Sequence, residues 1–169
     1  IGDPITQKKM ADFLLEARDL GLYTCVTDDG AGGLSSSVGE MARKPGGASI
    51  YLDKAPLKYA GLAPWEIFLS EAQERMTLAV PPKHLDAFLD LARRREVEAT
   101  VLGEFNDSGS LDCYFNGKLI GSLDMEFLHE GLPEMHLEAR LETPTPSVEL
   151  LLPGDENDLT GDLLQVLGS

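Results

Sequence analysis

Apolar and polar positions along the chain follow two repeating patterns. Apolar residues spaced three and four apart predict helices, which we place at residues 6–20, 34–43, 64–70, 83–95 and 159–167. Short runs rich in β-branched and aromatic residues, bounded by turn residues, predict strands at residues 22–27, 48–52, 76–80, 99–105, 111–115 and 118–123. Helices and strands therefore alternate as far as the strand at residues 99–105, and two further strands follow it.

The last three predicted strands read as a β-meander. Asn116-Gly117 is a strong signal for a type I′ hairpin between the final two. After Leu123 the pattern changes to an acidic, proline-interrupted stretch. We therefore expect a domain over residues 1–133, followed at 134–169 by an acidic linker and the lead-in to a further domain.

Residues 26–42 combine a strand end, two acids, a glycine loop and a helix that opens on serines. Asp28 or Asp29, at the carboxyl end of a strand, offers oxygen ligands to a magnesium ion. Backbone N–H groups at the helix start offer a place for an anion. The same composition also suits any tight turn, in which Asp28 simply caps the loop. Both interpretations stay open on this pattern alone.

The segment at residues 69–76 is unusually polar for a stretch between two apolar elements. A solvated loop explains this polarity, with Glu71 as a surface acid. A loop that faces a substrate is the functional alternative.

Charge narrows the possible functions. The 169 residues carry a net charge of -15, and residues 126–169 hold ten acids against one base, Arg140. This balance argues against binding to nucleic acid or to an anionic membrane. No apolar run approaches the roughly 20 residues that span a bilayer. An anionic substrate would need cations from a metal or from another part of the protein.

Neither a secreted nor a zinc-binding protein is indicated. No leader precedes Ile1, so we expect a cytoplasmic protein, and Ile1 in place of Met suggests a piece of a longer chain. Cys25 and Cys113 lack metal-site spacing and read as reduced core residues.

Two motifs together resemble one enzyme family. Residues 28–37, DDGAGGLSSS, resemble the Asp-Met-Gly-Ala-Ala-Gly-Leu-Thr-Ser-Ser segment of phosphoribosylformylglycinamidine synthase, the large PurL-type subunit. Residues 69–76, LSEAQERM, are similar to its Leu-Ser-Glu-Ser-Gln-Glu-Arg-Met segment. Gly2-Asp3-Pro4 matches a turn of the same family. The resemblance covers about residues 1–130.

The resemblance implies a fold, a reaction and partners. It implies an α+β domain of the aminoimidazole ribonucleotide synthetase C-terminal type: a three-layer α/β/α arrangement with a mixed, largely antiparallel sheet. The family uses ATP and Mg²⁺ to phosphorylate formylglycinamide ribonucleotide, and glutamine-derived ammonia then displaces the phosphate. The implied partners are a neighbouring ATP-binding-type domain, a glutaminase subunit and a small accessory subunit.

The resemblance also assigns residues. Asp28 matches the magnesium-binding aspartate, and Glu71, Ala72 and Gln73 match substrate-contacting positions. Ala72 replaces the usual serine, so a hydroxyl contact is lost there. No catalytic residue is assigned, because the family's catalytic histidine lies in the preceding domain. The chain by itself is therefore expected to be inactive.

Two alternatives compete with this assignment. One is a related ATP-dependent enzyme of the same superfamily, of the selenophosphate synthetase or hydrogenase maturation type. The other is a degenerate copy of the domain that serves only subunit contacts, which Ala72 slightly favours.

Overall fold

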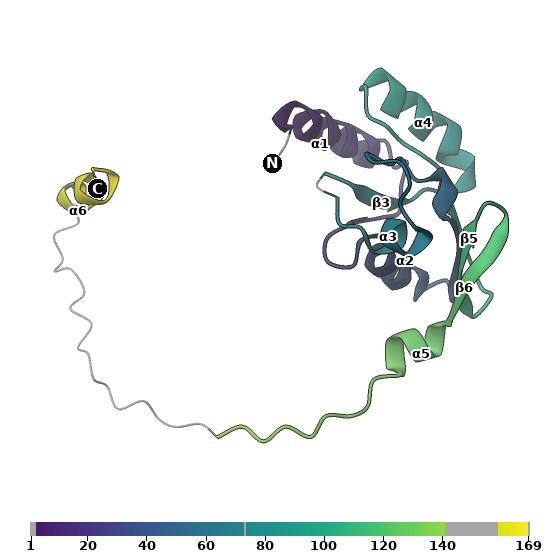
Figure 1. Cartoon of the computed structure of the whole chain (residues 1–169). Helices are drawn as coiled ribbons and strands as arrows, with labels where there is room; N and C mark the ends of the chain where they lie inside the picture. The colour runs from purple at the N-terminus through teal and green to yellow at the C-terminus, as the bar shows by residue number, and fades with distance from the viewer. Residues whose placement is uncertain (1–2, 73, 141–158, 169) are drawn as a thin grey trace. The chain divides into compact units, whose positions relative to one another are not determined.

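The chain divides into two units, Ile1–Pro133 and Glu134–Ser169. A computed structural model describes residues 3–72, 74–140 and 159–168 (Figure 1). In the second unit it describes residues 134–140 and a helix, α6 (Thr160–Leu167). The role of residues 134–169 as a linker to a further domain stays a prediction, and most of that predicted linker lies outside the described residues.

A four-stranded sheet supports the larger part of unit 1. Its strands are β2 (Gly47–Tyr51), β4 (Gly103–Asn106), β5 (Ser110–Phe115) and β6 (Lys118–Asp124). Their spatial order is β4-β2-β5-β6, and β2 runs parallel to β5 while the other pairs are antiparallel.

The hairpin prediction is confirmed, but the meander is wrong. Asn116 and Gly117 both have positive φ, 49° and 73°, as a type I′ turn requires. Strand β2 instead lies between β4 and β5. Gly103 allows part of this arrangement, because a Cβ at that position would overlap the Ser49 carbonyl on β2.

The larger hydrophobic core lies between this sheet and helices α2 (Gly33–Ala42) and α3 (Pro64–Leu69). A short helix that the sequence did not predict, α5 (Met125–Glu130), contributes Met125 to the core. The 3₁₀ turn that follows β2, η1 (Leu52–Lys54), contributes Leu52. The buried residues of this core are Leu34, Val38, Ala42, Ala48, Ile50, Leu52, Ala55, Ile67, Leu111, Cys113 and Met125.

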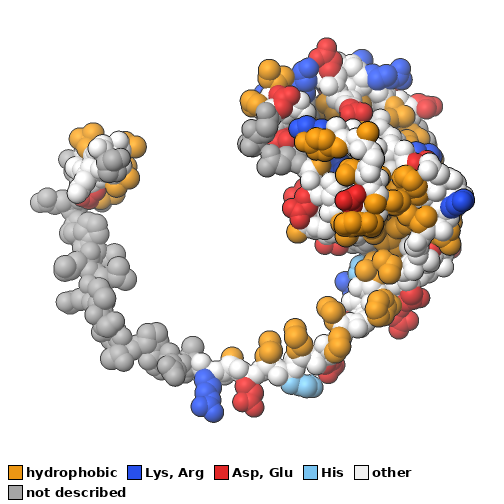
Figure 2. Space-filling model, in the orientation of Figure 1, with side chains coloured by type: hydrophobic (Ala, Val, Ile, Leu, Met, Phe, Trp, Pro, Cys, Tyr) orange, Lys and Arg blue, Asp and Glu red, His pale blue; other side chains and the backbone are white. Residues whose placement is uncertain are grey.

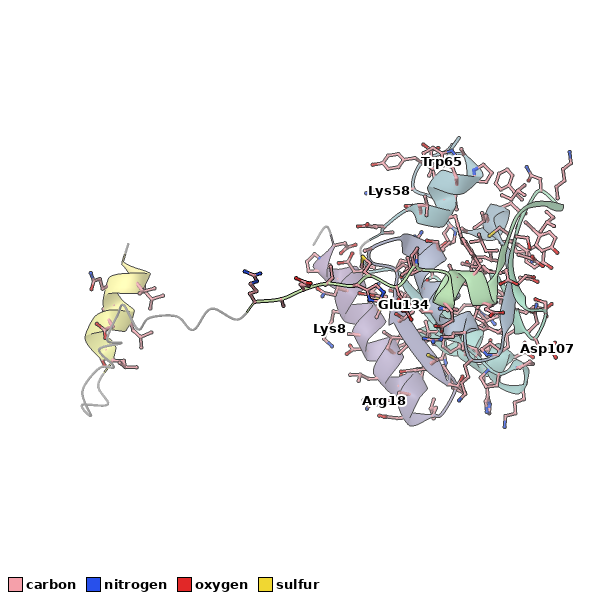
Figure 3. The ribbon with its side chains drawn as sticks, turned by 90° about the horizontal axis from the view of Figure 1, so that it is seen from below. Lys8, Arg18, Lys58, Trp65, Asp107 and Glu134 are labelled. Carbon is pink, nitrogen blue, oxygen red and sulfur yellow. The ribbon has the colours of Figure 1, made fainter. Side chains whose placement is uncertain are left out.

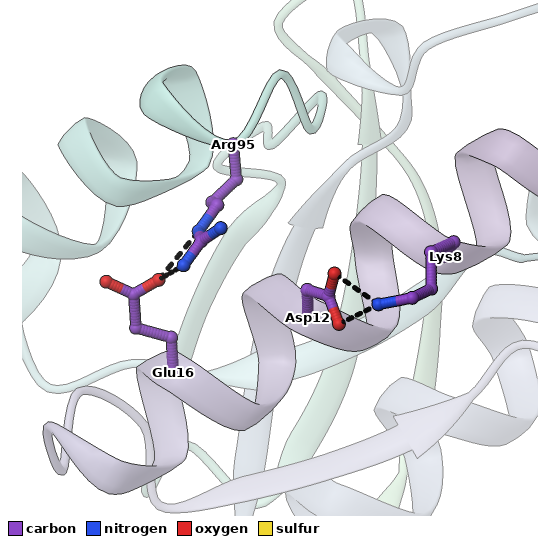
Figure 4. Close-up of polar contacts among 4 residues, drawn as sticks. All are labelled: Lys8, Asp12, Glu16 and Arg95. Carbon is purple, nitrogen blue, oxygen red and sulfur yellow. Dashed lines mark hydrogen bonds and ion pairs between the residues drawn. The ribbon is translucent and has the colours of Figure 1, made fainter.

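A second core joins helices α1 (Pro4–Asp19) and α4 (Leu85–Arg94) to a two-stranded sheet. The sheet pairs β1 (Cys25–Asp28) with β3 (Met76–Ala79), and a 3₁₀ turn, η2 (Pro82–His84), precedes α4. Phe13 and Phe88 meet edge to face, with ring centroids 5.0 Å apart. An Arg95–Glu16 ion pair adds an exposed link between the two helices (Figure 4).

The architecture is thus mixed α+β with helices packed on the sheets, which confirms the expected fold class. Among the described residues, no helix is both long and apolar enough to cross a membrane.

The two cysteines differ, contrary to the expectation that both belong to the core. Both thiols are free, but Cys25 is exposed on β1 whereas Cys113 is buried on β5. Burial, aided by the nearby Asp112 charge, raises the pKa of the Cys113 thiol to about 11 from an ordinary 9.0. Its contribution to stability is therefore complete below about pH 9 and is lost as the pH rises towards 11.

We predict that iodoacetamide at pH 8 modifies Cys25 and leaves Cys113 unmodified, as measured by mass spectrometry of the labelled peptides. The raised pKa leaves Cys113 with about 100-fold less thiolate than an ordinary cysteine, and the fold also covers it. In denaturant both cysteines should react. Equal labelling of both in the folded chain would contradict the buried position of Cys113.

Candidate functional site

An open pocket of about 540 Å³ lies where three segments of unit 1 meet. The segments are α1, the glycine loop after β1, and the loop before β3. The lining residues are Gln7, Met10, Asp28, Asp29, Gly30, Glu71, Ala72, Glu74, Arg75 and Met76. The structure therefore brings together Asp28, Glu71 and Ala72, three of the four predicted site residues. The fourth, Gln73, lies outside the described residues.

Strand pairing explains why the two motifs meet. Strands β1 and β3 are antiparallel, and their register places Asp28 directly opposite Met76. The end of β1 and the beginning of β3 therefore lie at the same edge of the small sheet. Beyond Asp28, the amide of Asp29 donates to the carbonyl oxygen of Arg75 at 3.1 Å, which extends the pairing by one step.

The adjacent acids Asp28 and Asp29 occupy different environments. Asp28 is exposed and lines the pocket, whereas Asp29 is only 2% exposed. The carboxylate of Asp29 accepts hydrogen bonds from Arg75 Nε at 2.8 Å and from Thr77 Oγ1 at 2.7 Å. Because both oxygens of Asp29 already have protein partners, Asp28 is the better placed of the two to bind an ion.

The glycine loop shapes this edge of the pocket. Gly32 and Gly33 have φ values of 86° and 55°, in the left-handed region that favours glycine. Gly33 also lies against the next motif, because a Cβ there would overlap the carbonyl oxygen of Ser70. The glycines thus allow the start of α2 to approach the loop before β3.

The serines near the start of α2 make hydrogen bonds to the glycine loop and to strand β3. Ser35 Oγ donates to the Gly32 carbonyl oxygen at 2.7 Å. Helix α2 begins at Gly33, so Ser37 lies within the helix rather than at its N-terminus. Ser37 is buried and bonds to Thr77 Oγ1 at 3.0 Å.

Asp28 suits a metal that takes few protein ligands. Within the described residues, no group of three or more His, Cys, Asp or Glu side chains is arranged to hold a metal ion. Mg²⁺ commonly binds through one or two carboxylates and completes its shell with water and substrate phosphates. An exposed carboxylate at the mouth of an open pocket fits that mode of binding.

The pocket is strongly acidic. Asp28, Asp29, Glu71 and Glu74 line it against one basic residue of the described lining, Arg75. Arg75 is paired with Asp29, so the pocket retains an excess of negative charge. A phosphate-bearing ligand would therefore require cations from outside these residues.

Helix α1 contributes residues that sequence reasoning missed. Gln7 and Met10 line the pocket from this helix. Their spacing of three residues places them on one helical face. That spacing is a usable signal, but the pattern does not reveal which element the face meets.

The chain belongs to the family described as AIR synthase related protein, C-terminal domain, whose model matches residues 1–116. Within that family it is similar to PurL-type subunits, which confirms the resemblance found in the sequence. The phosphoribosylformylglycinamidine synthase subunit PurL of Methanopyrus kandleri is 37% identical over 165 residues. The match covers 97% of this chain but only 23% of that protein.

Solved structures show the same relationship. Thermotoga maritima PurL in complex with AMPPCP matches 99% of this chain and 29% of its own, with a TM-score of 0.79 and 26% identity. The same protein in complex with FGAR matches 85% of this chain and 24% of its own, with a TM-score of 0.77 and 29% identity. The chain thus spans about a quarter of these relatives.

We predict that Gly33→Ala destabilises unit 1 by about 2–4 kcal/mol, because it combines backbone strain with steric overlap. Gly61→Ala is the matched control, since Gly61 also has positive φ, 85°, but nothing lies within 4 Å of an added Cβ. We expect the control to lose about 1 kcal/mol. Urea unfolding followed by circular dichroism measures both, and equal losses would rule out the close approach of Gly33 to Ser70.

Proposed function

We propose that this chain is the first C-terminal-type domain of a phosphoribosylformylglycinamidine synthase. In that role it forms one wall of the site where formylglycinamide ribonucleotide reacts with ATP and glutamine-derived ammonia. The supporting observation is the shared pocket, which places Asp28 of one motif beside Glu71 and Ala72 of the other.

The exposed carboxylate of Glu71 suits a neutral hydrogen-bond donor of the substrate. A carboxylate accepts hydrogen bonds, so Glu71 would bind hydroxyl or amide N–H groups rather than a phosphate. Ala72, which lacks a hydroxyl, would contribute backbone groups and surface. We assign Gln73 to the same substrate wall on the motif alone.

Asp28 would hold Mg²⁺ through its carboxylate. When bound, the ion neutralises phosphate charge during phosphoryl transfer. This assignment accommodates the acidic lining, because an anionic substrate could then approach Asp28 and Glu71 without facing uncompensated negative charge.

The remaining parts of the site would come from outside the chain. The ATP-binding groups, the catalytic histidine and further cations belong, on this proposal, to a neighbouring ATP-binding-type domain. A glutaminase subunit would supply ammonia, and a small accessory subunit would be a further partner. One similar solved structure is that of PurLQS from T. maritima. The chain alone should therefore show no turnover.

We predict that Asp28→Asn in the full-length protein lowers kcat/KM by about 100-fold or more and raises the half-saturating Mg²⁺ concentration. The amide is nearly isosteric but lacks the charge that binds the ion. Steady-state assays of ADP release with formylglycinamide ribonucleotide, titrated with Mg²⁺, measure both effects.

Asp107→Asn is the matched control, because it makes the same chemical change at an exposed site on the turn between β4 and β5 (Figure 3). Its kinetics should equal those of the wild type. An unchanged rate and unchanged Mg²⁺ dependence in Asp28→Asn would favour a purely structural domain. Turnover of selenide, with none of the ribonucleotide, would favour the related superfamily enzyme.

A further inference from the structure

A hydrogen-bonded cluster, in which Asp29 and Ser37 are buried, joins the two halves of the pocket. Its members are Asp29 after β1, Arg75 before β3, Thr77 in β3 and Ser37 in α2. We call it the Asp29 cluster, and we call residues 70–72 together with 74–75, which carry Glu71, the acidic loop.

The directions of the hydrogen bonds follow from the donor at Thr77. The Thr77 hydroxyl donates its proton to Asp29 Oδ1 at 2.7 Å. Thr77 then has no proton left for Ser37, so the Ser37 hydroxyl must donate to Thr77. Both hydroxyls of the cluster thus have a defined role, and α2 is thereby tied to the turn after β1.

Arg75 transmits the position of Asp29 to the acidic loop. Its Nε donates to Asp29, while its Nη2 donates to the carbonyl oxygen of Ser70 at the start of the loop. Its backbone N–H donates to the Ala72 carbonyl oxygen at 3.2 Å, and its own carbonyl accepts from the Asp29 amide at 3.1 Å. One residue therefore holds both ends of the acidic loop.

The backbone of the loop also needs an external restraint. Glu74 has a φ of 60°, a left-handed conformation that costs free energy for a residue with a Cβ. Such a conformation persists when the surrounding contacts determine it. The bonds of Arg75 to Ser70 and Ala72 supply such contacts.

We propose that Asp29 is a positioning residue that sets the acidic loop, and with it Glu71 and Ala72, at a fixed place opposite Asp28. Asp29 acts through Arg75 and does not touch the substrate or the metal itself. This role rests on the proposed function for its kinetic consequence, but the position of the loop can be measured without turnover.

The first test measures the acidic loop by hydrogen–deuterium exchange in the full-length protein. In Asp29→Asn, an N–H₂ group replaces one of the two accepting oxygens of the carboxylate. Either Arg75 or Thr77 is then left without its hydrogen-bond acceptor. We expect exchange in peptides covering residues 70–76 to quicken about tenfold or more, with α4 unchanged. Unchanged exchange in the loop, or equal acceleration in α4, would overturn the proposal.

Glu130→Gln is the matched control for this test. It makes the same carboxylate-to-amide change in an Arg pair, Arg43–Glu130, whose side chains are 65% and 64% exposed. The Asp29 carboxylate is 1% exposed in its pair with Arg75. Because exposed pairs contribute little, the control should leave exchange at residues 70–76 at the wild-type rate.

The second test separates positioning from stability. The double variant Asp29→Leu with Arg75→Met replaces the buried pair by apolar side chains, a change that commonly preserves stability. We expect a Tm near that of the wild type but a kcat/KM for formylglycinamide ribonucleotide lowered about 10- to 100-fold, mainly through a higher KM. If the Tm and the kcat/KM of the double variant both equal those of the wild type, the pair is only structural.

The two tests also separate this inference from the proposed function. If the wild-type protein fails to convert formylglycinamide ribonucleotide, the proposed function falls. The exchange measurement on Asp29→Asn still decides whether Asp29 positions the loop.

Discussion

The pairing of the buried Asp29 carboxylate with Arg75 is the interaction on which the pocket depends. It lies at the edge where β1, β3 and α2 meet, and Thr77 and Ser37 complete its hydrogen bonds. A carboxylate that is 1% exposed is tolerated only when charge and hydrogen bonds compensate it. The fold satisfies this requirement with residues from two separate motifs, so neither motif is complete without the other.

This pairing gives the two neighbouring acids different roles. Asp29 is buried and hydrogen-bonded to other protein groups, whereas the exposed Asp28 faces the pocket. The same pairing neutralises Arg75, the basic residue among the described lining. A pocket with this excess of acid is poorly suited to bind phosphate alone. The chain that carries this pocket is similar to proteins about four times as long.

The exposed surface of unit 1 carries several large apolar side chains. Figure 2 shows apolar side chains gathered on this surface. Trp65 on α3 is 63% exposed, and Leu119, Ile120 and Phe127 on β6 and α5 are between 47% and 67% exposed. Patches of this kind commonly mark contact surfaces.

Local patterns in the sequence determined most elements and the two motifs that define the family. The strand that contains Ile50, the hairpin at Asn116-Gly117 and the helix that starts at Pro64 follow from period, turn chemistry and capping, which act between near neighbours. Only the tertiary structure decided that β2 separates β4 from β5, that Cys25 is exposed, and that Asp29 rather than Asp28 is buried. Those outcomes depend on which distant segments meet. The periodic pattern of one segment does not show which other segment packs against it.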